Sequence, residues 1–181
     1  GYKPGDKAVV FGAGPIGLCV ASCLKYFGAS SVMIVEANPY RLQIAKQLGF
    51  TTIDATKEDV KEKIKAYTNG SYADFAFDCA AHPSVQAHIL EVIKVRGTAV
   101  IVGSYKKPAE VDLLKIEFKE LTMIGIRVYE PRDFEIAANI LESGSIDFDL
   151  LITEAAPEKA PEIFPELLQG SNTIKLMFKM Q

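Results

Sequence analysis

Residues 8–17 of the chain read AVVFGAGPIG. This run of β-branched and aromatic residues ends in three glycines with the spacing G-x-G-x-x-G, Gly12, Gly14 and Gly17, and an amphipathic run from Leu18 to Phe27 follows. A strand, a tight turn and a helix in this order are the context in which the glycine spacing indicates a dinucleotide-binding loop. Gly12 permits the sharp turn, Gly14 leaves room for a pyrophosphate to approach the backbone, and Gly17 lets the helix pack close to the strand.

The start of the predicted helix supplies the groups that would bind the pyrophosphate. The backbone N–H groups of Ile16 and Gly17 have no partner within the helix, so these donors and the helix dipole favour an anion there. Pro15 has no N–H to offer, but its fixed φ suits the first helical turn. The alternative is a glycine-rich turn that binds nothing, and a second signal downstream argues against that alternative.

Glu36 is this second signal. It ends an apolar run over residues 31–35 and lies 19 positions after Gly17. A carboxylate at the tip of the second strand can accept both ribose hydroxyls of an adenosine and repels a 2′-phosphate, which favours NAD over NADP. The alternative is a solvated acid at a strand end. Arg41 weakens the preference for NAD, because it could stack on adenine or hold a phosphate.

Composition excludes several classes of protein. The chain has 181 residues, 49% hydrophobic and 24% charged, with a net charge of −3, which is ordinary for a globular protein and argues against a nucleic-acid or anionic-membrane partner. No apolar run is long enough for a membrane span, and no signal peptide is apparent. Three cysteines make no disulfide framework, which favours a reducing cytoplasm. Because the first residue is Gly, we expect an excised fragment or a processed chain.

Strands alternate with helices along the chain. Periodicity predicts strands near residues 7–11, 31–35, 51–53, 73–77, 98–102 and 121–128. It predicts helices near 15–27, 39–48, 57–67, 83–93 and 131–143, with a looser segment over 105–120. This alternation predicts an α/β fold with a doubly wound parallel six-stranded Rossmann sheet in the order 3-2-1-4-5-6. We expect residues 1–145 to form an NAD(P)-binding domain and residues 146–181, with a strand-like run at 173–178, to lie outside that sheet.

Short patterns spread over most of the chain join the glycine loop and Glu36: Pro4-Gly5-Asp6, residues 10–18, Glu36 with Arg41-Leu42, residues 45–49, Val102-Gly103, Gly125-Ile126-Arg127 and Ile174-Lys175. In these residues the whole chain resembles the cofactor-binding half of the zinc-type medium-chain dehydrogenases, and its pattern is most like the sorbitol and threonine dehydrogenase branch. The resemblance implies an oxidoreductase that transfers a hydride between a secondary alcohol or polyol and NAD, and that depends on zinc at full length. It also implies that residues 146–181 would rejoin a catalytic domain absent from this chain.

The resemblance implies further cofactor contacts. Cys79 and Ala80 would line the cleft, and backbone groups near three residues would take the nicotinamide carboxamide: Val102, Gly103 and Ile126. Arg127 would lie near the nicotinamide, and Lys175 would reach the pyrophosphate. For Arg127 and Lys175 the alternative is a solvated charge at a strand end.

The chain departs from that family in its catalytic chemistry. The family's zinc ligands and most of its substrate pocket come from a preceding domain, and we name no catalytic and no metal-binding residue here. His82 and His88 are six apart and do not share a helix face closely enough to clamp a metal. Cys19 and Cys23 could bind one metal, but small apolar packing explains them better. Asp74 and Asp78 share a face of one strand, and solvation at strand ends explains them as well.

Three functions remain open at this point. The first is the NAD-binding part of a zinc-dependent alcohol or polyol dehydrogenase. The second is the cofactor half of a zinc-free, NADPH-dependent quinone or enone reductase, which Glu36 opposes. The third is a non-catalytic, NAD-sensing module. In each case we expect a homo-oligomer, because the apolar strand predicted at 121–128 lies at the sheet edge, where a second copy can pair.

Overall fold

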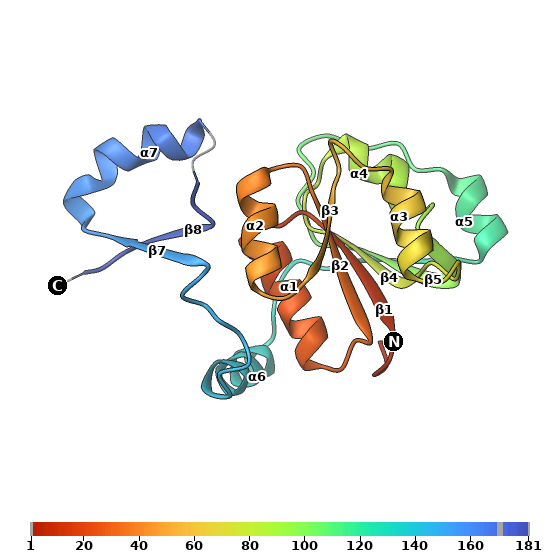
Figure 1. Ribbon diagram of the computed structural model, residues 1–181, viewed down its shortest axis with the longest axis horizontal. Coiled ribbons are helices and arrows are strands. Elements are labelled where there is room, and N and C mark those ends of the chain that lie inside the picture. The colour runs from red at the N-terminus through yellow and green to blue at the C-terminus, as the bar shows by residue number, and fades with distance from the viewer. Residues whose placement is uncertain (1, 170–171, 181) are drawn as a thin grey trace.

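The computed structural model describes residues 2–169 and 172–180. Its main part is one sheet of six parallel strands in the order β3-β2-β1-β4-β5-β6, with helices on both faces (Figure 1). The strands are β1 (Lys7–Phe11), β2 (Ser31–Glu36), β3 (Thr51–Asp54), β4 (Ala73–Asp78), β5 (Ile93–Ile101) and β6 (Thr122–Gly125). The predicted fold class and strand order are confirmed.

The helices are α1 (Pro15–Tyr26), α2 (Pro39–Gln47), α3 (Val60–Tyr67), α4 (Pro83–Ile89), α5 (Leu113–Lys119) and α6 (Pro131–Glu142). Helices α1 and α2 cover one face of the sheet, where Leu18 and Ile44 pack against Val10. Helices α3 and α4 cover the other face, where Ile64 and Ile89 join the second core cluster. Because both faces are buried, the central strands are apolar almost throughout.

Short polar side chains set the starts of several helices. The side chains of Asn38, Asp59 and Asp112 each accept a hydrogen bond from the backbone N–H three residues later, at 3.0–3.1 Å. His82 plays this part for α4, where its Nδ1 accepts from the Ser84 N–H at 3.3 Å. These acceptors satisfy backbone donors that the first helical turn leaves unpaired.

Helix α4 ends at Ile89 rather than near residue 93, so the predicted end of this helix was wrong. Strand β5 begins at Ile93, which pairs with Ala73, and the register then shifts before Phe75 pairs with Thr98. Lys119 at the end of α5 stabilises this junction, because its Nζ donates to three carbonyls, those of Leu90, Glu91 and Ile93, at 2.8–3.1 Å.

Two further predictions near the sheet edge were wrong. The segment 105–120 contains a helix, α5, which sequence periodicity missed because none of its residues is buried. Strand β6 covers Thr122–Gly125 only, which is half of the predicted range. Its far edge is paired with no strand in the part of the chain that the structure describes.

The C-terminal residues form a separate two-stranded parallel sheet of β7 (Ile152–Ala155) and β8 (Lys175–Phe178). A short 3-10 turn, η1 (Pro157–Lys159), and helix α7 (Ala160–Leu168) form the connection between these two strands (Figure 1). Leu151 and Ile174 anchor this part, because both are buried against the α1 and α2 face of the main sheet. Of the predicted segment 146–181, residues 170, 171 and 181 lie outside the described residues.

Candidate functional site: a dinucleotide cleft

The glycine loop between β1 and α1 leaves no space for side chains at two of its three glycines. Gly12 has a φ of +99°, which L residues rarely adopt, and a Cβ there would lie 3.2 Å from the Ala80 Cβ. A Cβ on Gly17 would lie 1.9 Å from the Gly12 carbonyl oxygen, which is a severe clash. The nearest atom to a Cβ on Gly14 would be Arg41 Nη1 at 3.9 Å, so Gly14 keeps the surface of the loop open.

Helix α1 points its amino end at the space above this loop. Pro15 is its first residue. The N-cap residue is Gly14, so no side chain at this position accepts a hydrogen bond from the first helical turn. Since the Leu18 N–H is the one that donates to the Gly14 carbonyl, at 3.0 Å, the N–H groups of Ile16 and Gly17 have no partner within the helix. Two backbone donors and the positive end of the helix dipole therefore meet at one point, which suits an anionic group.

Glu36 lies beside the loop at the end of β2. Its Oε2 accepts a hydrogen bond from the Ala13 N–H at 2.8 Å, and its Oε1 accepts from Ala37 and Asn38 at 2.7 and 2.9 Å. Arg41 Nη1 lies 3.9 Å from Oε2. The carboxylate is thus fixed by backbone amides and remains beside a cation.

A cleft of about 560 Å³ joins these groups. It contains nine of the residues that the sequence predicts for cofactor binding: Gly12, Gly14, Pro15, Ile16, Gly17, Glu36, Arg41, Cys79 and Ala80. The sequence did not predict the part of the lining that α3, α4 and the N-cap residue of α4 supply: Val60, His82, Ser84, Val85 and His88. These residues carry no motif, so only the packing of the helices brings them to the cleft.

Five predicted contacts lie outside this cleft. The N–H groups of Val102 and Gly103 donate to the Asp78 carbonyl at the carboxyl end of β4, and the Ile126 N–H donates to Ile101. Arg127 is exposed beyond the end of β6. Lys175 begins β8, where its N–H donates to Leu151, so it belongs to the separate C-terminal sheet.

Asp78 is a functional candidate that sequence reasoning missed. The sequence interpretation was a solvated strand end, and this is wrong, because Asp78 is 0% exposed. Its Oδ1 accepts from the N–H groups of Ala80 and Ala81 at 3.0 and 2.8 Å, and its Oδ2 accepts from the Tyr105 hydroxyl. Burial, followed by this bond to Asp78, raises the pKa of Tyr105. The one available signal was a carboxylate at the carboxyl end of a central strand.

The three cysteines of the chain are all free and partly buried. Burial, followed by the charge of Asp78, raises the pKa of Cys79 to about 12, so it is not a thiolate nucleophile at neutral pH. Burial also raises the pKa of Cys19 and of Cys23.

Among the residues that the structure describes, no group of three or more His, Cys, Asp or Glu side chains could hold a metal ion. These residues therefore do not fit a zinc ion.

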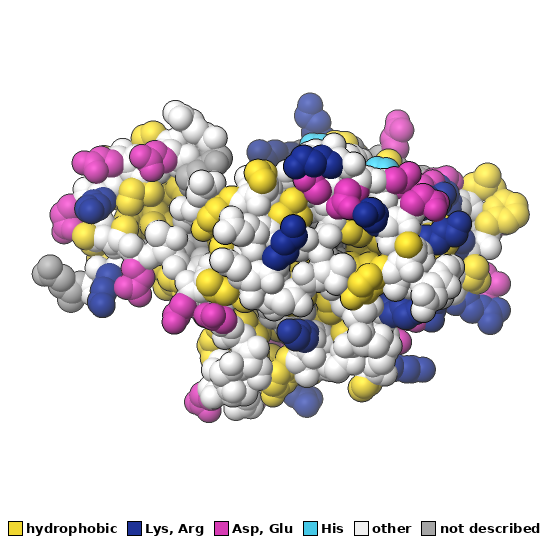
Figure 2. Space-filling model, in the orientation of Figure 1, with side chains coloured by type: hydrophobic (Ala, Val, Ile, Leu, Met, Phe, Trp, Pro, Cys, Tyr) yellow, Lys and Arg dark blue, Asp and Glu magenta, His cyan; other side chains and the backbone are white. Residues whose placement is uncertain are grey.

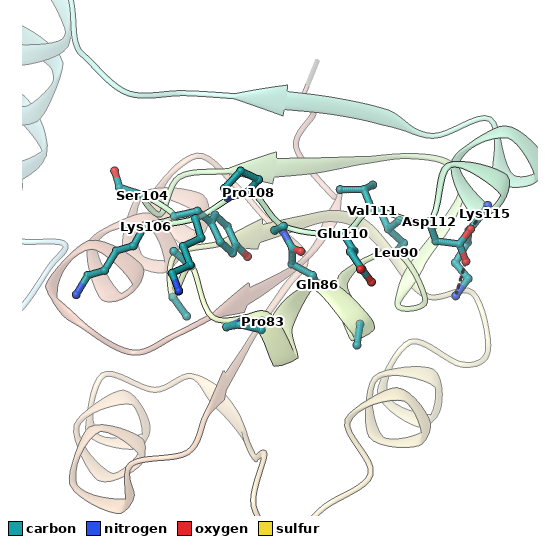
Figure 3. Close-up of a pocket in the computed structure, with 16 residues that line it drawn as sticks. Pro83, Gln86, Leu90, Ser104, Lys106, Pro108, Glu110, Val111, Asp112 and Lys115 are labelled. Carbon is teal, nitrogen blue, oxygen red and sulfur yellow. Dashed lines mark hydrogen bonds and ion pairs between the residues drawn. The ribbon is translucent and has the colours of Figure 1, made fainter.

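A second cleft of about 950 Å³ adjoins the first and shares Ala80 with it. Figure 3 shows it between the loop that follows β5, with Ser104, Lys106, Pro108 and Glu110, and the side chains of α4. Lys115 and Asp112 form an ion pair, with 3.7 Å between Nζ and Oδ2, at one end of it (Figure 3). This cleft carries charges of both signs and no buried unpaired group among the described residues.

The outer surface has apolar side chains near the sheet edge. In Figure 2 they gather over α5, which has Leu113, Leu114 and Phe118 more than 60% exposed. No helix among the described residues is both long and apolar enough to cross a membrane.

Comparison with known proteins identifies the family. A family model described as zinc-binding dehydrogenase matches residues 15–143. The chain is 35% identical over 181 residues to (R,R)-butanediol dehydrogenase of Bacillus subtilis, which covers 98% of this chain and 51% of that protein. It is 31% identical over 160 residues to sorbitol dehydrogenase 1 of Saccharomyces cerevisiae, which covers 84% of this chain and 45% of that protein.

The fold agrees with solved structures of the same kind. The crystal structure of 2R,3R-butanediol dehydrogenase from Bacillus subtilis superposes with a TM-score of 0.91 at 33% identity, over 99% of this chain and 52% of that chain. The chain spans about half the length of the curated relatives that it matches. The resemblance predicted from the sequence is confirmed, and the chain belongs to the zinc-binding dehydrogenase family.

Proposed function

We propose that this chain binds NAD(H) as the cofactor-binding part of a dehydrogenase that transfers a hydride between a secondary alcohol or polyol and NAD. The observation that carries the proposal is the cleft in which the glycine loop, the start of α1 and Glu36 meet. The glycine loop and the start of α1 suit the pyrophosphate of a dinucleotide, and Glu36 suits its adenosine ribose. The order of these features along the chain is that of a dinucleotide-binding unit.

The pyrophosphate would lie at the start of α1, where Ile16 and Gly17 offer backbone donors beside the open surface at Gly14. The adenosine ribose would lie at Glu36, and Arg41 would lie beside it. The apolar wall of Val60 and Val85 would face the adenine. The bound nicotinamide supplies the hydride acceptor, and the protein binds and orients it.

We also propose the remaining contacts that the resemblance implies. The ends of β5 and β6, with Val102, Gly103 and Ile126, would hold the carboxamide, and Arg127 would lie near the nicotinamide. The position of Val102 and Gly103 beside the Cys79–Ala80 turn supports the first of these contacts. Lys175 would reach the pyrophosphate from the start of β8, in the C-terminal sheet.

The substrate and the metal would belong to the full-length enzyme. The relatives' names specify butanediol and sorbitol, both of which carry secondary alcohols. We propose that residues 1–145 form the cofactor domain and that residues 146–181 rejoin a catalytic domain outside this chain, which would also hold the zinc.

The three free cysteines support a reducing cytoplasm. Two copies would associate through the edge of β6, and the net charge of −3 favours no nucleic-acid partner.

Titration of the chain with NADH and with NADPH tests the proposal, with the fluorescence of the reduced nicotinamide as the signal. We expect NADH to bind at least about tenfold more tightly, because a 2′-phosphate would meet the Glu36 carboxylate. A preference for NADPH would favour the quinone or enone reductase instead. If neither NADH nor NADPH binds, the proposal is overturned.

A further inference from the structure

Asp78 joins two segments of the chain that are far apart in the sequence. Its side chain binds the turn that follows β4 through the N–H groups of Ala80 and Ala81. Its backbone carbonyl accepts from the N–H groups of Val102 and Gly103, at 2.9 and 2.8 Å, in the turn that follows β5. One residue therefore sets the positions of both turns.

Tyr105 completes this arrangement. Its hydroxyl donates to the Asp78 Oδ2, so the loop after β5 is also tied to the end of β4. In the part of the chain that the structure describes, no ion pair involves Asp78. A buried carboxylate without a cation is unfavourable unless hydrogen bonds satisfy it, so the Tyr105 hydroxyl and the two amides together allow the charge to be buried.

The turn that Asp78 holds is tightly packed and has an unusual backbone. Ala81 has a φ of 50°, which L residues rarely adopt, and its own N–H is bonded to the Asp78 carboxylate. A Cβ on Gly103 would lie 2.8 Å from the Ala81 Cβ, and a Cβ on Gly12 would lie 3.2 Å from the Ala80 Cβ. The turn is thus wedged between the glycine loop and the end of β5, and a shift of the turn would move the surface of the cleft.

We propose that Asp78 and Tyr105 are positioning residues that fix the nicotinamide end of the cleft. The inference rests on the proposed function, which assigns Val102 and Gly103 to that end, beside the turn of Cys79 and Ala80 that lines the cleft. The adenosine end is held by a separate set of bonds, those of Glu36 to Ala13, Ala37 and Asn38, in which Asp78 takes no part. Loss of the Asp78–Tyr105 bond should therefore affect one end of the dinucleotide and not the other.

The test compares two ligands in the same variants. NADH reaches both ends of the cleft, whereas AMP reaches the adenosine end only. We expect Tyr105→Phe and Asp78→Asn to weaken NADH binding about tenfold, the effect of one lost hydrogen bond to a charged group, and to leave AMP binding within about twofold. The fluorescence of bound NADH should also change, because the nicotinamide would lie in a looser site.

Asp74→Asn is the matched control. Asp74 lies four residues earlier on β4, and its carboxylate accepts from the Lys7 N–H and pairs with Lys94, at the end of the strand away from the cleft. This variant should lower the stability of the fold and leave the ratio of NADH to AMP affinity unchanged. Amide hydrogen exchange at Ala80 and Ala81, which needs no ligand, should become faster in Tyr105→Phe and stay unchanged in Asp74→Asn.

The outcomes separate this inference from the proposed function. A wild-type chain that binds neither NADH nor AMP would overturn the function, and this inference with it. A wild-type chain that binds both, with a Tyr105→Phe variant in which NADH and AMP affinities stay equal to wild type or fall together, would overturn the positioning role alone. Tyr105→Phe carries the test if Asp78→Asn does not fold.

Discussion

The backbone N–H of Ala13, in the glycine loop, donates a hydrogen bond to the Glu36 Oε2 at the end of β2, with 2.8 Å between nitrogen and oxygen. The other oxygen of the same carboxylate is held by the N–H groups of Ala37 and Asn38. Three amides therefore fix the acid and the loop as one unit before any ligand arrives. A site organised in this way loses little conformational freedom on binding.

Glu36→Gln should weaken NADH binding about tenfold, because the amide NH2 of glutamine would face one of the three backbone N–H groups that the carboxylate now accepts from. It should also reduce the preference for NADH over NADPH, because glutamine has no charge to repel a 2′-phosphate. Parallel fluorescence titrations with the two cofactors measure both effects. Asp54→Asn is the matched control: Asp54 is the register partner of Glu36 on β3, but its side chain bonds Thr56 and Lys57 outside the cleft. An unchanged ratio of the two affinities in Glu36→Gln would contradict the role given to the acid.

Gly17→Ala should destabilise the fold by about 1–3 kcal/mol or more, because its Cβ would lie 1.9 Å from the Gly12 carbonyl oxygen and the backbone would have to move. It should also abolish NADH binding, since that movement displaces the donors of α1. Urea unfolding and NADH titration measure the two effects.

Gly125→Ala is the control for this substitution, because a Cβ on Gly125 meets no atom within 4 Å. Its free energy of unfolding should stay within about 0.5 kcal/mol of the wild type, as for an ordinary surface substitution. Equal stabilities of Gly17→Ala and Gly125→Ala would show that the close packing of the loop is not a constraint.

The central part of the fold was predictable because its signals are local. Gly12, Gly14 and Gly17 lie within six residues, and the backbone of this one turn requires a glycine at the first and the third of these positions. The apolar runs of β1 and β2 are buried on both faces, so their burial does not depend on which helix covers them. Glu36 follows directly from the second run. Together these features determine the order of the first elements and the position of the cleft.

The rest depends on contacts between distant residues. No side chain of helix α5 is fully buried, and of its apolar residues only Ile116 packs, partly buried, against the core. The helix therefore has no clear apolar periodicity, and Lys119 at its end fixes it to the Leu90 carbonyl, just after α4. The apolar residues after Ile89 suit a helix as well as a strand, and the pairing of Ile93 with Ala73 decides between the two. Asp78 looks like a solvated acid until Tyr105, which lies 27 positions further along the chain, is placed against it.

The stability of the chain should fall as the pH rises above about 9. The thiol of Cys79 has an ordinary value of 9.0 in the unfolded chain, whereas burial raises its pKa to about 12 in the folded protein. Between these values the folded state binds more protons than the unfolded state, so the free energy of unfolding decreases by up to about 1.4 kcal/mol per pH unit for this one group. Below pH 9 this thiol is protonated in both the folded and the unfolded chain, so it no longer makes the free energy of unfolding depend on pH.

Urea unfolding at pH 8, 9 and 10 under reducing conditions measures this slope. Cys79→Ala should be less steep than the wild type, and the slope that remains should come from Cys19 and Cys23, whose pKa values burial raises in the same direction. If the wild type and Cys79→Ala lose stability in parallel, the thiol of Cys79 is not protected by the fold.

Self-association should depend on the edge of β6. Met123 and Ile124 are 39% and 43% exposed there, and the far side of the strand is paired with no strand among the described residues. An apolar strand edge of this kind pairs readily with a second copy, and a lysine on an edge strand opposes such pairing. We therefore expect the wild type to be a dimer in sedimentation velocity runs at high concentration, and Ile124→Lys to be a monomer.

Leu168→Lys separates this effect from a general loss of apolar surface. Leu168 lies at the end of α7 and is 90% exposed, so the substitution adds the same charge on a different part of the molecule. It should sediment as the wild type does, because a charge far from β6 does not face the second copy. A wild type that stays monomeric at all concentrations, or an Ile124→Lys variant that dimerises as strongly as Leu168→Lys, would exclude β6 as the interface.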